Sequence, residues 1–79
     1  MDILKVFATN LKKYRNKIGL SQVNFAEKAG LHRTYISAIE CEKRSISLEN
    51  IQKIADALEI SVFLLFVDEQ NVTIERGGE

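Results

Sequence analysis

Four polar side chains within five residues carry hydrogen-bonding groups that suit nucleic-acid recognition: Arg33, Thr34, Tyr35 and Ser37. A guanidinium can donate to both O6 and N7 of one guanine, so Arg33 is the first candidate for reading a base, with a phosphate contact as the alternative. Thr34 and Tyr35 suit thymine methyl groups, bases or phosphates, and Ser37 suits a phosphate or a base one turn further along. For Tyr35 a packed, half-buried ring is the other interpretation.

Three further polar residues at the edges of this segment could add contacts to DNA. Gln22 is expected at the N-terminus of a preceding helix, where free backbone amides and the positive end of the helix dipole attract anions. It is therefore a candidate clamp for the phosphate backbone. Lys43 and Arg44 follow the segment in a polar loop of residues 41–46, where Lys43 is expected to act through its charge.

His32 and Cys41 are the residues that could suggest catalysis or metal binding, and the sequence favours neither. One cysteine and one histidine cannot build a structural zinc site, and Cys41 has no second cysteine with which to form an internal disulfide. His32 is expected instead at a helix cap or a backbone contact. The sequence contains no glycine-rich phosphate loop, H-E-x-x-H or paired acidic motif. We therefore expect a protein that is not an enzyme and uses no metal or cofactor.

Two short helices with a turn between them are expected to position the polar side chains. Apolar residues three and four apart indicate the first helix: Phe25, Ala26 and Ala29. Gly30 ends it, because glycine adopts the positive φ of a helix C-terminus without a Cβ penalty. The second helix begins at residue 32 or 33, and its Ile36 and Ile39 point inward. The segment 22–39 therefore predicts a DNA-binding helix-turn-helix with a polar outer face.

This pattern resembles the helix-turn-helix regulators of the phage repressor and Cro type, within the broad group of xenobiotic-response-element-like domains. The similarity covers roughly residues 8–66. Members typically have a glutamine opening the first helix, a small residue, a glycine at the turn and aliphatic residues in the second helix; here these are Gln22, Ala26, Gly30, Ile36 and Ile39. The resemblance implies a compact, all-α, five-helix DNA-binding domain of the lambda-repressor-like type.

Within that group, one long run is similar to the controller proteins that regulate bacterial restriction–modification genes: RTYISAIECEKRSISLENIQKIADAL. These proteins have an arginine in the loop after the second helix, and the resemblance implies that Arg44 reaches into a groove. Glu42 departs from the basic loop that is common in these relatives.

Three more helices are expected around the motif, which makes five in all. The first begins at the cap Asp2 and closes at Gly19. The fourth is capped by Ser47 and carries an apolar stripe that is expected in the core: Leu48, Ile51, Ile54, Ala55 and Leu58. Ser21 caps the first helix of the motif, and Ser61 caps a short last helix.

The last helix, residues 62–66, is apolar on more faces than a domain of this size can cover. Exposed apolar surface marks interfaces, and two-fold homodimers are the commonest assembly. The expected interface comprises Ile60, Phe63, Leu64 and Phe66; the alternative is that these residues only complete the monomer core. Residues 1–67 are expected to form the domain and residues 68–79 a polar tail, in which residues 72–74 could add a strand.

Charge is unevenly distributed along a chain whose net charge is zero. Residues 10–44 contain eight basic and three acidic residues, which is the electrostatic footprint expected of a nucleic-acid binder; a surface charged only for solubility is the plainer alternative. Two interpretations, phosphate attraction or a solvated helix face, apply to Lys12, Lys13, Arg15, Lys17 and Lys28. The N-terminus lacks the pattern of a signal peptide and the longest apolar run is too short to span a bilayer, so a cytoplasmic protein without a membrane partner is expected.

The sequence therefore favours a homodimeric, sequence-specific transcription regulator that binds palindromic operators and controls restriction–modification genes, including its own. Double-stranded DNA and a second copy of the chain are its expected partners, with RNA polymerase as a further candidate. A phage-like repressor or an autoregulating antitoxin is the alternative within DNA binding. The alternative from another class is a protein-interaction module, with a vestigial helix-turn-helix and a binding surface at residues 62–66.

Overall fold

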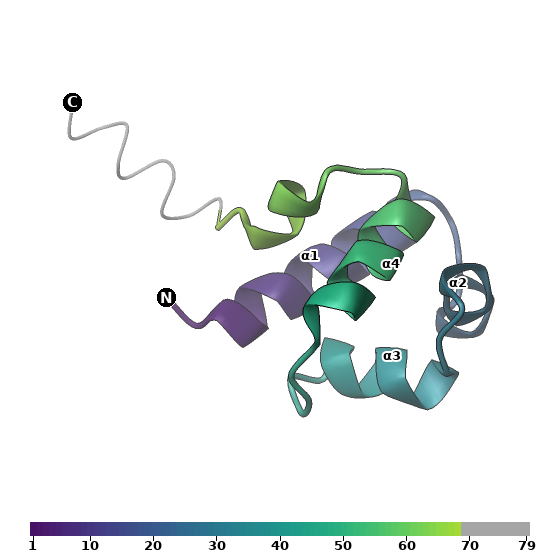
Figure 1. Ribbon diagram of the computed structural model, residues 1–79, viewed down its shortest axis with the longest axis horizontal. Helices are drawn as coiled ribbons and strands as arrows, with labels where there is room; N and C mark the ends of the chain where they lie inside the picture. The colour runs from purple at the N-terminus through teal and green to yellow at the C-terminus, as the bar shows by residue number, and fades with distance from the viewer. Residues whose placement is uncertain (69–79) are drawn as a thin grey trace.

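The computed structural model describes residues 1–68, which form four α-helices and a terminal 3-10 helix. The elements are α1 (Ile3–Lys17), α2 (Gln22–Ala29), α3 (Arg33–Glu40), α4 (Leu48–Leu58) and η1 (Val62–Phe66). Figure 1 shows α3 running beneath α1 and α4, with α2 beside the start of α3. The strand suggested at residues 72–74 lies outside the described residues.

The last element corrects the prediction of five α-helices. Residues 62–66 wind as a 3-10 helix, in which the Leu64 amide donates to the Ser61 carbonyl oxygen at 3.1 Å. Ser61 occupies the N-cap position, but its side chain makes no capping hydrogen bond. A segment of five residues can form few i to i+4 bonds, and the tighter i to i+3 winding is common in such short pieces. The all-α prediction is confirmed for residues 1–68, with a 3-10 helix in fifth place.

Side-chain caps start the first, second and fourth helices, as the sequence predicts. The Asp2 carboxylate accepts from the amides of the first turn of α1, at 3.1 and 3.3 Å. The Ser21 hydroxyl accepts from the Asn24 amide at 3.0 Å, and the Ser47 hydroxyl from the Asn50 amide at 3.2 Å. Each cap satisfies a backbone donor that the helix itself leaves without a partner, so the three helix starts are fixed by local chemistry.

The turn between α2 and α3 depends on the left-handed conformation of Gly30, whose φ is 73°. The next residue, Leu31, donates its amide to the Ala26 carbonyl oxygen at 2.9 Å and packs its side chain against the core. This is the hydrogen-bond pattern of a Schellman motif, which closes a helix and turns the chain. The predicted turn is confirmed, and it sets the direction in which α3 leaves α2.

Two glutamates, Glu42 and Glu59, adopt the same left-handed conformation without being glycine, with φ of 62° and 60°. A Cβ atom in this conformation crowds the following carbonyl oxygen at a cost of about 1–2 kcal/mol. We expect Glu42→Gly to raise the free energy of unfolding by about 1 kcal/mol or less, because the flexibility of glycine in the unfolded chain offsets part of the relief. Glu42→Ala is the matched control, since it removes the carboxylate and keeps the Cβ atom. Urea titration that finds both variants equally stable would attribute the effect to charge instead.

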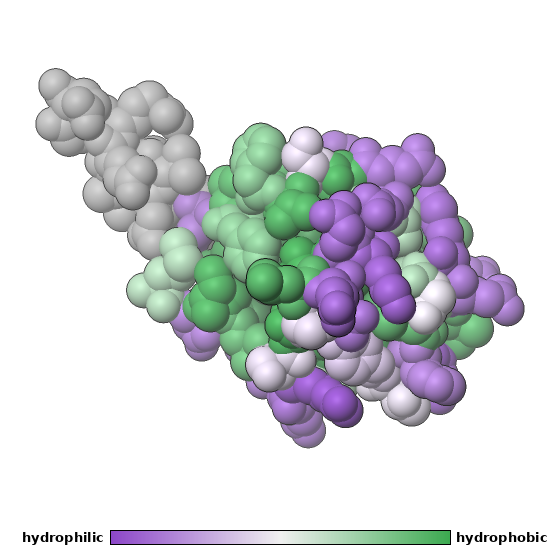
Figure 2. Space-filling view, viewed as in Figure 1, coloured by the Kyte–Doolittle hydropathy of each residue, from purple (hydrophilic) through white to green (hydrophobic). Residues whose placement is uncertain are grey.

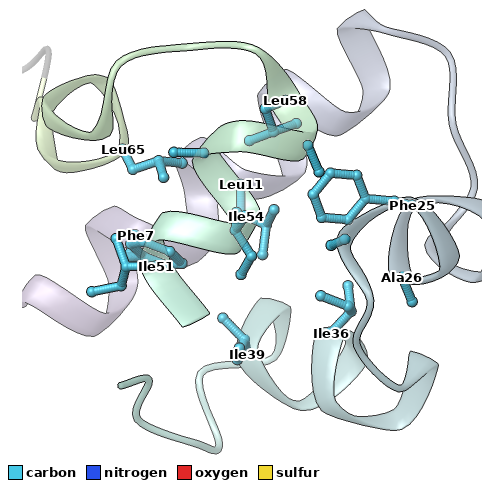
Figure 3. Packing of buried hydrophobic residues seen from close by; sticks show 13 residues of the cluster. Phe7, Leu11, Phe25, Ala26, Ile36, Ile39, Ile51, Ile54, Leu58 and Leu65 are labelled. Atoms are coloured by element: carbon cyan, nitrogen blue, oxygen red, sulfur yellow. The ribbon is translucent and has the colours of Figure 1, made fainter. Parts of the chain in front are cut away.

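The core lies where α1, α3 and α4 meet, with α2 and η1 closing its ends (Figure 3). Its fully buried large side chains come from every element: Phe7, Leu11, Phe25, Ile36, Ile39, Ile54 and Leu65. Ile36 and Ile39 point from α3 into this core, as predicted, and each is 0% exposed. Burying such a side chain contributes about 1.5–3 kcal/mol. The two isoleucines therefore fasten α3 firmly to the body of the domain.

Leu48 is an exception to the predicted apolar stripe of α4, because it is 84% exposed. It is the first residue of α4 and faces solvent, although Asn50 in the same turn is half-buried and contacts Tyr35 of α3. The buried stripe therefore begins one turn later, at Ile51, and continues through Ile54 to Leu58. Helical spacing alone predicts which face of a helix a residue lies on. It does not predict how far along the helix the neighbouring elements cover that face.

Asn10 is a buried polar residue that sequence reasoning did not single out. Its side-chain amide donates to the carbonyl oxygens of Leu65 at 2.9 Å and Val67 at 3.0 Å. Beside it, the rings of Phe7 and Phe66 lie 5.4 Å apart between centroids. Together these contacts fix η1 against α1. Within residues 1–68, no helix has both the length and the apolar character needed to cross a membrane.

Candidate nucleic-acid interface

The N-terminal turn of α3 presents its polar side chains to solvent. Arg33 and Thr34 are exposed, and Ser37 is half-buried one turn later. The opposite face of the same helix carries the buried Ile36 and Ile39. Since α3 is anchored along one side only, its outer face and its N-terminus are free to enter a groove, which is the arrangement by which a recognition helix reads base edges.

Tyr35 of α3 is half-buried, and its side chain contacts α4 and the loop that follows α3. Its hydroxyl oxygen accepts a hydrogen bond from Nδ2 of Asn50 at 3.0 Å. The guanidinium of Arg44 lies 5.1 Å from the centroid of its ring, within the range of a cation–π contact. The structure thus brings Arg44 and Tyr35 together, while Lys43 is exposed in the same loop.

The side-chain amide of Gln22 is hydrogen-bonded within the domain. Nε2 donates to Oε1 of Glu40 at 2.9 Å, and the residue is half-buried at the start of α2. This amide hydrogen is therefore engaged with α3. A phosphate clamp at this position would use the backbone amides of the first turn of α2, which face the helix N-terminus.

Arg15 and Glu40 form a buried ion pair that was not predicted from the sequence. Nε and Nη2 of Arg15 donate to the two carboxylate oxygens of Glu40 at 2.7 and 3.0 Å, and the side chains are 10% and 1% exposed. Nη1 of Arg15 donates to the carbonyl oxygen of Leu20 at 2.8 Å. Together with Gln22, the pair joins α1, α2 and the C-terminus of α3. Arg15 therefore does not belong to the phosphate-attracting cluster.

A signal for this pair was present in the spacing. Arg15 follows the buried Leu11 by four residues, and Glu40 follows the buried Ile36 by four residues. Residues four apart share a helix face, so both charges project towards the core. Two opposite charges on inward faces of different helices are best satisfied by each other.

Comparison with known proteins agrees with the helix-turn-helix geometry of α2 and α3. The model of the family described as helix-turn-helix matches residues 11–65. The chain belongs to this helix-turn-helix family. It is 45% identical over 98% of its length to the control protein C.SmaI of Serratia marcescens, of which it covers 90%. The resemblance to restriction–modification controllers is thus confirmed.

Solved structures that share this helix-turn-helix fold include two restriction–modification controllers. The restriction–modification controller protein C.AhdI from Aeromonas hydrophila has a TM-score of 0.77 and 41% sequence identity, over 80% of this chain and 96% of that protein. The controller protein C.Esp1396I, solved as a tetramer with its natural 35 base-pair operator, has a TM-score of 0.76 and 29% identity, over 100% of this chain and 99% of that one.

The basic excess around the helix-turn-helix survives the burial of Arg15. One positive and one negative charge leave the surface together in the Arg15–Glu40 pair, so the balance of residues 10–44 is unchanged. Lys12 and Lys17 are exposed on α1, and Lys13 lies 5.1 Å from the Tyr14 ring centroid. On α2, Lys28 is paired with Glu59 at 3.0 Å, in an exposed contact that leaves the lysine accessible to solvent.

His32 and Cys41 lie at the two ends of α3, one before its first residue and one after its last. His32 is the exposed N-cap residue of α3, and its side chain makes no capping hydrogen bond. Cys41 is exposed and carries a free thiol. Among residues 1–68 no three histidine, cysteine or acidic side chains gather where they could hold a metal ion.

Of the four residues predicted for a dimer interface, one is exposed and three are half-buried. Phe63 is 66% exposed, whereas Ile60, Leu64 and Phe66 are half-buried. Leu65, between them, is fully buried and belongs to the monomer core. Figure 2 shows hydrophobic side chains gathered on the face of the domain that η1 covers. A large exposed ring within such a face is what an apolar interface requires.

Proposed function

We propose that this helix-turn-helix protein is a sequence-specific transcription regulator that binds double-stranded DNA as a homodimer. The observation that carries the proposal is the geometry of α3: Ile36 and Ile39 anchor one face, and Arg33 and Thr34 stand exposed at its N-terminus. A helix held in this way can enter the major groove and read base edges. C.Esp1396I, solved on its operator, supports the assignment of DNA as the partner.

The proposed dimer binds a palindromic operator. Two-fold symmetry of the protein places two copies of α3 in successive major grooves, with half-sites about 34–36 Å apart. The face around Phe63 is the proposed contact between the copies, with Ile60, Leu64 and Phe66 at its edge. The arrangement is that of a lambda-repressor-like domain whose fifth element is a 3-10 helix.

The proposed targets are restriction–modification genes, including the gene of the protein itself, in the cytoplasm. Similarity to C.SmaI and C.AhdI supports this choice. RNA polymerase is the further partner that an activating role would require. A phage-like repressor or an autoregulating antitoxin remains the alternative within DNA binding. An adjoining endonuclease and methyltransferase gene would support the controller role, whereas adjoining phage or toxin genes would support the alternative.

A second candidate function rests on the exposed Phe63. An apolar face could recruit a different protein, with the helix-turn-helix serving only as a scaffold. The two functions respond differently to salt, because DNA binding releases counterions and weakens steeply as salt rises, whereas apolar contact does not. Titration of DNA at two salt concentrations therefore distinguishes a DNA-binding protein from a protein-interaction module. Neither proposed function includes enzymatic activity.

Arg33→Ala is the substitution that tests base reading. We expect it to cost about 1–3 kcal/mol of binding free energy on the preferred operator and to relax the preference at one base pair. Arg33→Lys is the matched control, since it keeps the charge and loses the two-pronged guanidinium. Fluorescence anisotropy on the operator and on single-base variants measures both effects. If Arg33→Ala weakens binding equally on all sequences, Arg33 contacts a phosphate instead.

A further inference from the structure

Asn50 of α4 contacts Tyr35, a residue of the proposed DNA-binding surface. It is the third residue of α4, and its own backbone amide is fixed by the Ser47 cap at 3.2 Å. Its side-chain amide donates to the hydroxyl oxygen of Tyr35 at 3.0 Å, in a partly buried contact between residues fifteen positions apart. The start of α4 is thus connected directly to the outer part of α3.

The direction of this hydrogen bond decides what the Tyr35 hydroxyl can do. A phenolic oxygen that accepts from an amide keeps its own proton for a different partner. Since Asn50 occupies the acceptor side, the hydroxyl is left as a donor. Phosphate oxygens and the O6, O4 and N7 atoms of bases are all acceptors, so this is the polarity that DNA contact requires.

The same hydrogen bond also fixes a platform for the loop. The Arg44 guanidinium lies over the Tyr35 ring, 5.1 Å from its centroid, although Arg44 itself is exposed. A ring that is free to rotate would not hold a cation on one face. By restraining the ring, Asn50 also restrains where the guanidinium of Arg44 is presented.

We propose that Asn50 is a positioning residue for DNA recognition, acting through Tyr35 and, by way of its ring, through Arg44. The inference rests on the proposed function and adds to it a residue on α4, outside the helix-turn-helix itself. Asn50 is expected to affect affinity for the operator without contacting the DNA.

A double-mutant cycle on the preferred operator tests the proposal. We expect Asn50→Ala and Tyr35→Phe each to weaken operator binding about 5-fold to 10-fold. The double variant should bind the operator at most about twofold more weakly than either single variant. The matched control is Gln52→Ala, which removes an exposed amide from the same helix, where it pairs with Asp56 at 2.8 Å. This control should leave affinity within about twofold of wild type. Independent losses that multiply in the double variant, or no loss for Asn50→Ala, would overturn the proposal.

Asn50→Asp provides a test that preserves shape. A carboxylate can only accept, so it takes the hydroxyl proton of Tyr35 and removes the donor from the DNA side. Its added charge weakens binding to every DNA, and the decisive quantity is therefore the ratio of operator affinity to random-sequence affinity. We expect this ratio to fall about fivefold. An unchanged ratio would overturn the proposal, while a wild-type protein that prefers no sequence would instead refute the proposed function.

Discussion

Arg15→Ala is expected to destabilise the domain by about 3–5 kcal/mol, because it leaves the Glu40 carboxylate buried without its cation. Glu40 is 1% exposed in its side chain, and both of its oxygens accept from Arg15. Gln22 alone would then remain as a neutral donor to it. Small domains have a total stability of about 5–15 kcal/mol, so this loss would remove a large share of it. Urea unfolding followed by circular dichroism measures the change.

Lys28→Ala is the control for Arg15→Ala. The Lys28–Glu59 pair has a similar length, 3.0 Å, but its side chains are 41% and 78% exposed. An ion pair in water contributes about 0–1 kcal/mol, so this variant should stay close to wild type. A second variant replaces both buried charges, Arg15→Met with Glu40→Leu, and should recover much of the lost stability. Equal, small effects for Arg15→Ala and Lys28→Ala would contradict the assigned role of the buried pair.

Phe63→Asp is expected to convert the proposed dimer to monomers. Phe63 is 66% exposed in the single chain, so the substitution removes little from the monomer core. In a two-fold interface it removes two aromatic rings and introduces two carboxylates of like charge. We expect the dissociation constant of the dimer to rise about 100-fold or more, which is about 2.8 kcal/mol at 1.4 kcal/mol per tenfold change. Sedimentation equilibrium measures it.

Val23→Asp is the matched control for the dimer. Val23 is another exposed apolar residue, 53% accessible, and it lies on α2, which Figure 1 shows away from η1. This variant should sediment as wild type does. A persistent dimer in Phe63→Asp would move the interface to another face, with the exposed Leu48 as the next residue to test.

The features that depend on local chemistry were predictable from the sequence. The caps at Asp2, Ser21 and Ser47 and the turn at Gly30 each require only the residue and its nearest neighbours along the chain. The inward faces of Ile36 and Ile39 follow from helical spacing alone. For this reason the helix-turn-helix and its exposed polar residues could be recognised before the fold was known.

The features that depend on contacts between distant segments were not predicted. The Arg15–Glu40 pair joins residues 25 positions apart, and the Asn10 contact with Leu65 joins residues 55 positions apart. Asn50 was similarly overlooked, because its contact with Tyr35 exists only once α4 has packed beside α3. Leu48 was assigned to the core because spacing gives the face of a helix and not the extent of its neighbours.

Selection of bound DNA from a random pool, followed by titration of the selected sequence at two salt concentrations, tests the central claim most directly. We expect a palindrome with half-site centres about one helical turn apart, bound by two subunits, with affinity that falls steeply as salt rises. Failure to enrich any sequence, together with weak binding that is the same for all DNA, would contradict the account and favour a protein-interaction module.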